Sequence, residues 1–210
     1  DDLVTGVQTC ALPILEIGTF QIGLGNSMPG MALIREFRRR FPGVQVQVEL
    51  GSWANIIAAV VEQRVDVGVL PNVPDDGRFL RRICVKQDVV AIVAEDAPLA
   101  QLTQTSCSEL VRHPLIFRTA TSSTQRVVDR GFRSSGLAPR PTMVLDTRDG
   151  VHEAVANGLG IGFMWEFGSS RKDGIRKLRV VDFEQSHPEH VFHLTGRASP
   201  LVRAFQAIQI

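Results

Sequence analysis

The stretch LEIGTFQIGLGNSMPGMALIREFRRRFPGVQVQVELGSWANIIAAVVEQRVDVGVL, residues 15–70, decides the fold. Five segments alternate as strand, helix, strand, helix and strand: residues 15–22, 28–41, 44–50, 53–61 and 66–70. The strand segments are apolar or alternate apolar with polar side chains, and the helix segments place apolar side chains three and four residues apart. Two strand–helix–strand units in series predict a parallel sheet covered by helices, which binds ligands outside the carboxyl ends of its strands.

Composition excludes several classes of protein. At 210 residues and 44% hydrophobic content, the chain can bury a core in one domain or two small ones. The 23 basic and 22 acidic residues give a net charge of +1, which argues against nucleic-acid binding through the chain's own charge. No apolar run reaches the roughly 18 residues of a membrane span, and the acidic start lacks the basic region of a signal peptide. Three cysteines, an odd number, favour a reducing cytoplasm: Cys10, Cys84 and Cys107.

The chain divides into a short leading segment and two lobes. Residues 1–14 lack periodicity and resemble the conceptual translation of sequencing-adaptor DNA joined to a gene fragment, and a native linker is the alternative. Beyond residue 70 the strand and helix patterns recur, at residues 79–86, 88–94, 114–117, 122–134, 141–145, 149–157, 161–165, 191–194 and 200–208. We therefore expect lobe I from residues 15–87 plus 191–210, lobe II from residues 88–190, and a ligand cleft between them.

Polar side chains that precede or begin four predicted helices are the candidate ligand contacts. They are Asn26, Ser27, Ser52, Ser122, Ser123, Thr124 and Thr147. Helix N-termini offer unpaired N–H groups and partial positive charge, so this set favours an anion. Arg118 and Arg148 add guanidinium groups that suit a carboxylate or phosphonate. The alternative interpretation is that each hydroxyl or amide only caps its helix.

Other motifs carry less functional information. The glycines of residues 158–162 follow a predicted helix and precede a strand, the reverse of a dinucleotide-binding loop. His190 and His193 would lie on opposite faces of a strand, and Cys84 lies in an apolar run, so neither a metal nor a redox site is expected. The basic run at residues 35–40 is interpreted as a solvated helix face. No catalytic motif is present, so neither an enzyme nor a cofactor is predicted.

Over residues 15–208 the order and spacing of short segments resemble the effector-binding domain of LysR-type transcriptional regulators. The segments are LIREFRRRFPGV (33–44), RVDVGV (64–69), AEDAPLA (94–100), HPLI (113–116), SSTQR (122–126), AVANGLGIGF (154–163) and SPLVRAF (199–205). The resemblance implies a periplasmic-binding-protein-like fold (type 2) of two Rossmann-like α/β lobes with a small-molecule effector in the cleft. It also implies a homodimer or homotetramer, and a winged helix-turn-helix domain, absent from this chain, that binds DNA.

Two finer expectations follow from this resemblance. Residues 122–126, 149–153 and 166–168 resemble regulators associated with aminoethylphosphonate catabolism, which agrees with an anionic effector. Trp165 stands where many relatives have proline or a small residue, so we expect it to narrow the cleft or to stack on the ligand.

The resulting hypothesis is a cytoplasmic sensory domain of a transcription factor, in which a small anion bridges the lobes and shifts their arrangement. The alternative is a solute-binding protein of a transport system with the same fold, which would need a signal peptide or a lipid-anchor cysteine.

Overall fold

Parallel strands from the first part of the chain form one side of a five-stranded sheet in lobe I. The computed structural model describes residues 18–25 and 27–210. In spatial order the strands are β2 (Val44–Leu50), β1 (Gly18–Leu24), β3 (Val67–Pro71), β11 (His187–Leu194) and β4 (Phe79–Gln87). β1 pairs in parallel with both β2 and β3, as the two strand–helix–strand units predict. The helices of this lobe are α1 (Ser27–Arg40), α2 (Trp53–Val61) and α6 (Pro200–Gln206).

Lobe II contains a four-stranded sheet and a separate strand pair. The sheet order is β6 (Gln104–Thr105), β10 (Ile175–Val180), β5 (Val89–Ala94) and β9 (Gly162–Trp165). β7 (Ile116–Arg118) and β8 (Met143–Leu145) form the parallel pair. The helical segments are η1 (Pro98–Gln101), α3 (Cys107–Leu110), α4 (Ser123–Ser134) and α5 (Arg148–Ala156). The mixed α/β architecture of two lobes agrees with the predicted fold class.

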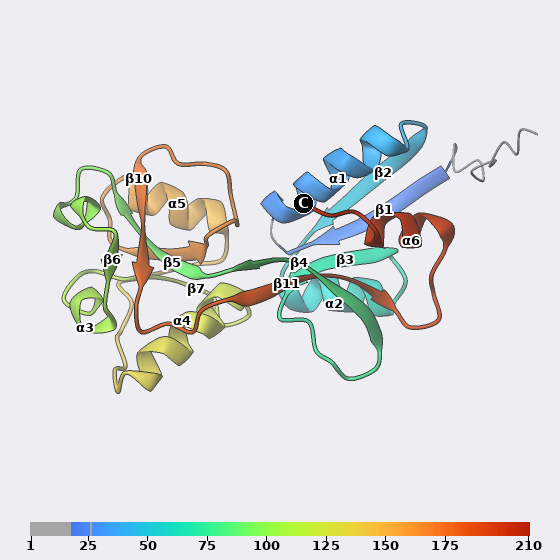
Figure 1. Cartoon of the computed structure of the whole chain (residues 1–210). Coiled ribbons are helices and arrows are strands. Elements are labelled where there is room, and N and C mark those ends of the chain that lie inside the picture. The colour runs from blue at the N-terminus through green and yellow to red at the C-terminus, as the bar shows by residue number, and fades with distance from the viewer. Residues whose placement is uncertain (1–17, 26) are drawn as a thin grey trace, which may run out of the picture.

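Two neighbouring strands join the lobes. β11 pairs antiparallel with β4 from His187 to Leu194, and with β3 on its other side. Figure 1 shows β4 and β11 running together from the middle of the molecule into the lobe that carries α1 and α2. Both crossings between the lobes therefore lie at paired strands.

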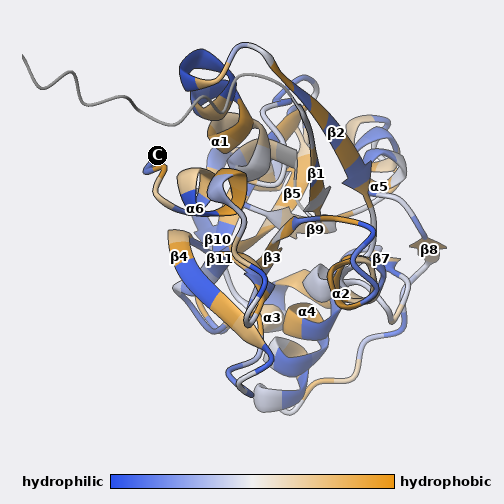
Figure 2. Cartoon of the chain, turned by 90° about the vertical axis from the view of Figure 1, so that its right-hand side faces the viewer, coloured by the Kyte–Doolittle hydropathy of each residue, from blue (hydrophilic) through white to orange (hydrophobic). Residues whose placement is uncertain are grey.

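Each sheet is covered on both faces by helices. In lobe I, one cluster packs α1 and α6 against the sheet through Phe20, Phe37 and Phe205, and another packs α2 through Ile56 and Phe192. The edge strand β2 alternates hydrophobic and hydrophilic residues (Figure 2), and Val48 and Leu50 remain exposed on it.

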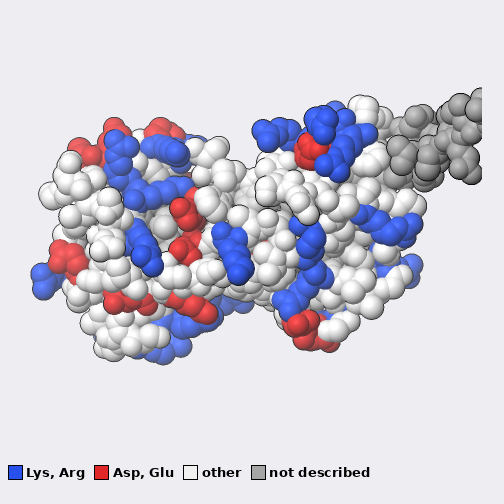
Figure 3. Space-filling model, in the orientation of Figure 1, with Lys and Arg blue, Asp and Glu red and all other residues white. Residues whose placement is uncertain are grey.

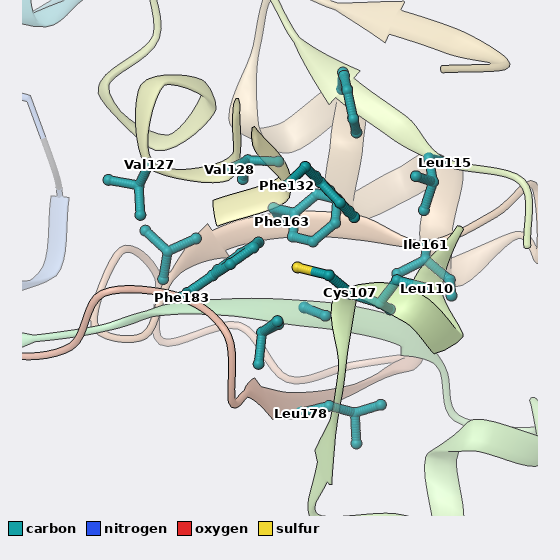
Figure 4. Packing of buried hydrophobic residues seen from close by; sticks show 14 of the residues in the cluster. Cys107, Leu110, Leu115, Val127, Val128, Phe132, Ile161, Phe163, Leu178 and Phe183 are labelled. Atoms are coloured by element: carbon teal, nitrogen blue, oxygen red, sulfur yellow. The ribbon is translucent and has the colours of Figure 1, made fainter. Parts of the chain in front are cut away.

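In lobe II the α3–α4 face holds a cluster of aromatic side chains. Phe132, Phe163 and Phe183 lie within about 6 Å of one another, centroid to centroid, and the Cys107 sulfur points among them (Figure 4). The opposite face is packed by α5 through Val151 and Val155. Each lobe therefore has its own apolar clusters, one on each face of its sheet.

Two details differ from the sequence-based prediction. β1 continues through Gly23 to Leu24, two residues beyond the strand predicted to end at residue 22. A Cβ at Gly23 would lie 2.9 Å from the Ile56 side chain, so glycine at this position lets α2 pack close to β1. β10 was not predicted, since basic residues separate its apolar side chains and these face opposite sides of the sheet: Ile175 packs on the α5 face, and Leu178 packs on the α3–α4 face.

The basic run on α1 forms part of the surface. Figure 3 shows Lys and Arg side chains gathered over α1, with an acidic side chain among them. Arg39 and Arg40 both pair with Glu36 at 2.8–2.9 Å, and these contacts lower the pKa of Glu36 to about 2. The local ion pairs agree with the interpretation of a solvated face.

Candidate functional site

A cavity of about 320 Å³ lies between the lobes, at the carboxyl ends of parallel strands from both. Lobe I contributes the ends of β1 and β2 and the start of α2, and lobe II contributes the segments that follow β7 and β8. The lining residues are Leu24, Gly25, Leu50, Gly51, Ser52, Trp53, Arg118, Thr119, Thr121, Ser122, Ser123, Thr124, Asp146, Thr147, Arg148 and Asp149. The topology therefore brings strand ends from both lobes to one ligand-sized space.

Three helices begin at this cavity: α2, α4 and α5. The Ser52 hydroxyl caps α2 by accepting from the Asn55 N–H at 3.2 Å, Ser122 caps α4, and Thr147 caps α5 by accepting from the Gly150 N–H at 3.0 Å. The helices have 9, 12 and 9 residues, so each has a full first turn with unpaired N–H groups. Their combined partial charges favour an anion in the cavity.

Arg118, the last residue of β7, adds a cationic group to the wall. Its Nη2 donates to the Asp146 carbonyl oxygen at 2.7 Å, while its Nε is buried and has no hydrogen-bond partner among the described residues. Burial lowers the pKa of Arg118, the neighbouring charge of Arg148 lowers it further, and the charge of Asp146 opposes both. The guanidinium stays charged at neutral pH because an arginine pKa lies so far above it. Arg118 therefore contributes a positive charge to the cavity wall that favours an anionic ligand.

Arg148, the first residue of α5, connects the two lobes. Its Nη2 donates to the Gly25 carbonyl oxygen of lobe I at 2.8 Å, and its Nη1 donates to the Gly168 carbonyl oxygen at 3.2 Å. Burial lowers the pKa of Arg148, whereas the charges of Asp149 and Glu189 raise it. The side chain therefore spans the cleft at one end of the cavity as well as contributing charge.

A second inter-lobe contact lies at Trp53, the first residue of α2. The Arg126 guanidinium lies 4.7 Å from the centre of the Trp53 ring, and the indole N–H donates to the Pro71 carbonyl oxygen at 2.9 Å. A smaller cavity of about 190 Å³ adjoins this pair and shares Ser123 with the main one. The cation–π contact favours the arrangement in which α2 and α4 lie close together.

The ten predicted site residues do not all lie at the cavity. Seven of them line the main cavity: Ser52, Arg118, Ser122, Ser123, Thr124, Thr147 and Arg148. Ser27 is the first residue of α1, and Asn26 lies outside the described residues. Trp165 does not reach the cavity surface. It is 1% exposed, and its Nε1–H donates to the Ser123 hydroxyl at 3.1 Å, so it stands behind the wall instead of narrowing the cleft.

Two acidic residues in the wall were not predicted. Asp146 and Asp149 both line the cavity, and both are exposed. Their positions next to Thr147 and Arg148 in the sequence were the available signal, because residues flanking a helix N-cap share its surroundings. The cavity therefore offers carboxylate acceptors beside its many donors.

The described residues contain neither a metal-binding cluster nor a membrane-spanning helix. No group of three or more His, Cys, Asp and Glu side chains among residues 18–25 and 27–210 is arranged to hold a metal ion. Two histidines of β11 contact other groups: His187 Nδ1 lies 3.2 Å from Asn72, and His190 Nε2 lies 3.2 Å from Arg81. Within the same described ranges, no helix has the length and apolar character needed to cross a membrane.

Comparison with known proteins gives matches along nearly the whole chain. A family model described as the LysR substrate binding domain matches residues 15–208. The HTH-type transcriptional activator CmpR of Synechocystis sp. is 26% identical over 178 residues, which are 82% of this chain and 58% of that protein. The phosphonates import ATP-binding protein PhnC of Anaeromyxobacter dehalogenans is 30% identical over 203 residues, 90% of this chain and 40% of that protein. The chain thus spans about half the length of these relatives.

Solved structures share the fold. The effector-binding domain of QuiR in complex with shikimate has a TM-score of 0.79 at 19% identity, covering 91% of this chain and 94% of that one. The regulatory domain of Synechocystis CcmR in complex with 2-PG has a TM-score of 0.77 at 18% identity, covering 92% of this chain and all of that one.

Proposed function

Because the chain belongs to the LysR substrate-binding domain family, we propose that it is the effector-sensing part of a cytoplasmic, DNA-binding transcriptional regulator. One observation carries the proposal: three helix N-termini and Arg118 surround a single cavity between two lobes. A ligand there would contact both lobes at once. A winged helix-turn-helix domain elsewhere in the full-length protein would bind DNA, and the protein would assemble as a homodimer or homotetramer.

The effector we propose is a small oxyanion, and more narrowly a phosphonate such as 2-aminoethylphosphonate. The hydroxyl donors, the helix N-termini and the arginine charge support an anionic group. The carboxylates of Asp146 and Asp149 on the same cavity wall could receive an ammonium group at the other end of the ligand. The relative whose name refers to phosphonate import adds support for this chemical class.

The mechanism is a shift in population and involves no catalysis. Arg148 and the Trp53–Arg126 contact join the lobes here, and an open arrangement would lack these contacts. An anion that satisfies donors from both lobes binds the closed arrangement more tightly and increases its population. The change in lobe orientation would be transmitted through β4 and β11 to the rest of the assembly.

The test is a thermal-shift and calorimetric screen of the chain with 2-aminoethylphosphonate, ethylphosphonate, phosphonoacetaldehyde, sulfate and acetate. We expect a saturable rise in melting temperature with the phosphonates. We also expect 2-aminoethylphosphonate to bind more tightly than ethylphosphonate, which lacks only the amine, and expect the Asp149→Asn variant to reduce that difference. If no anion shifts the melting temperature, the oxyanion assignment is wrong, and uncharged effectors that stack on Trp53 become the next candidates.

A further inference from the structure

We propose that Trp165 is a positioning residue for the effector: its indole N–H turns the Ser123 hydroxyl proton into the cavity, so that Ser123 donates a hydrogen bond to an oxygen of the ligand. The inference rests on the proposed binding of an oxyanion between the lobes. It assigns a ligand-directed role to a side chain that touches no part of the cavity surface.

Trp165 is held rigidly behind the cavity wall. It is the last residue of β9, pairs with Val89 of β5, and is almost fully buried. The ring of His187 packs against it edge to face, with centroids 5.3 Å apart. A buried tryptophan N–H needs an acceptor, and here the Ser123 oxygen lies 3.1 Å from Nε1. Since the indole has one donor and cannot reorient, the direction of this hydrogen bond is fixed.

This hydrogen bond determines the direction in which the Ser123 hydroxyl can donate its proton. A hydroxyl has one proton, and with the indole N–H pointing at its oxygen, that proton must point elsewhere. No described residue accepts it within hydrogen-bond distance. Ser123 is the first residue of α4 and lines the main cavity, so a ligand oxygen bound there can accept this proton. Accepting the indole N–H also polarises the hydroxyl and strengthens it as a donor.

Three other hydroxyls in the cavity wall also accept a hydrogen bond from an N–H group. Ser52, Ser122 and Thr147 each accept a backbone N–H from their own helix, which leaves their protons directed away from it. With Ser123 the cavity therefore has four hydroxyls whose oxygens already accept an N–H. The first three follow from helix capping and need no other residue. Ser123 is the exception, because it depends on a side chain from a different strand.

The experiment measures dissociation constants by calorimetry for four proteins: wild type, Trp165→Phe, Ser123→Ala and the double variant. The probes are 2-aminoethylphosphonate and sulfate at pH 7. Losing a hydrogen bond to a charged group should weaken binding by about 10- to 150-fold in Ser123→Ala. Trp165→Phe keeps the ring and removes the N–H, and we expect it to weaken binding by about 3- to 10-fold. In the double variant we expect no loss beyond that of Ser123→Ala.

Phe183→Leu serves as the matched control, because Phe183 belongs to the same aromatic cluster as Trp165 and lies outside the cavity wall. It should lower the melting temperature and leave the dissociation constants unchanged. If Trp165→Phe weakens binding as much in the Ser123→Ala background as in wild type, or if Phe183→Leu weakens it equally, Trp165 acts only through stability and the proposal is wrong.

Two further results separate this inference from the proposed function. Proton exchange of the indole N–H groups, followed by NMR without ligand, should be slow for Trp165 in wild type and fast in Ser123→Ala. Tight binding of a probe by wild type with unchanged binding by Trp165→Phe would overturn only this inference. If wild type binds neither probe, both the oxyanion site and the role of Trp165 are overturned.

Discussion

Replacing Arg118 with methionine should separate effector binding from folding stability. Methionine keeps much of the apolar stem of arginine and removes the guanidinium. An anion that meets this group gains a charge-assisted hydrogen bond of about 1.5–3 kcal/mol. Its loss corresponds to about 10- to 150-fold weaker binding of 2-aminoethylphosphonate. We therefore expect a clear loss of affinity in calorimetry at fixed salt.

The stability of the ligand-free protein should change much less. The substitution removes the hydrogen bond from Arg118 to the Asp146 carbonyl, which costs about 1.5–3 kcal/mol for a charged donor. The substitution also removes the buried Nε, which has no partner among the described residues, and this stabilises the folded protein by about 1–3 kcal/mol. It further removes the charge repulsion between Arg118 and Arg148. These terms oppose each other, so the free energy of unfolding in urea should stay within about 1 kcal/mol of wild type.

Arg112→Met is the matched control, since the Arg112 side chain is 72% exposed in the same lobe and pairs only with Glu109 among the described residues. It should change neither affinity nor stability. If Arg118→Met instead lowers the free energy of unfolding by more than about 2 kcal/mol and leaves binding intact, Arg118 is a structural residue and the reasoning fails.

Three further predictions concern the framework around the site. Gly68→Ala would place a Cβ 2.4 Å from the Phe192 ring, so it should lower the free energy of unfolding in urea by about 1–3 kcal/mol or more, and a wild-type value would contradict this packing. Burial raises the thiol pKa of Cys84 to about 12 and of Cys107 to about 11, so peptide mapping after iodoacetamide at pH 8 should find both unmodified in the folded protein and both alkylated in urea. Burial lowers the pKa of His190 to about 4, below its unfolded value of about 6.5, so the unfolded state takes up this proton first as the pH falls. Stability should therefore fall between about pH 6.5 and pH 4, and more steeply in wild type than in His190→Gln; equal slopes in urea titrations would exclude His190 as the cause.

Local patterns determined the elements that begin at the cavity. The helix after Ser52 follows from apolar side chains at helical spacing, and its predicted range agrees with α2. Ser122 and Thr147 were recognisable as N-caps because capping depends on residues only three positions apart. Since β1, β2 and β3 follow one another with helical crossovers, their parallel pairing also followed from the sequence.

The sequence by itself therefore determined the α/β class, the helix N-termini and the polar character of the cleft, because each depends on neighbours within a few positions. Only the tertiary structure decided what those groups do. Arg148 contacts a carbonyl 123 positions away, and Trp165 donates to Ser123 from 42 positions away instead of facing the ligand. The first contact depends on how the two lobes lie against each other and the second on how β9 packs beside α4 within lobe II, and no periodicity along the chain encodes either arrangement.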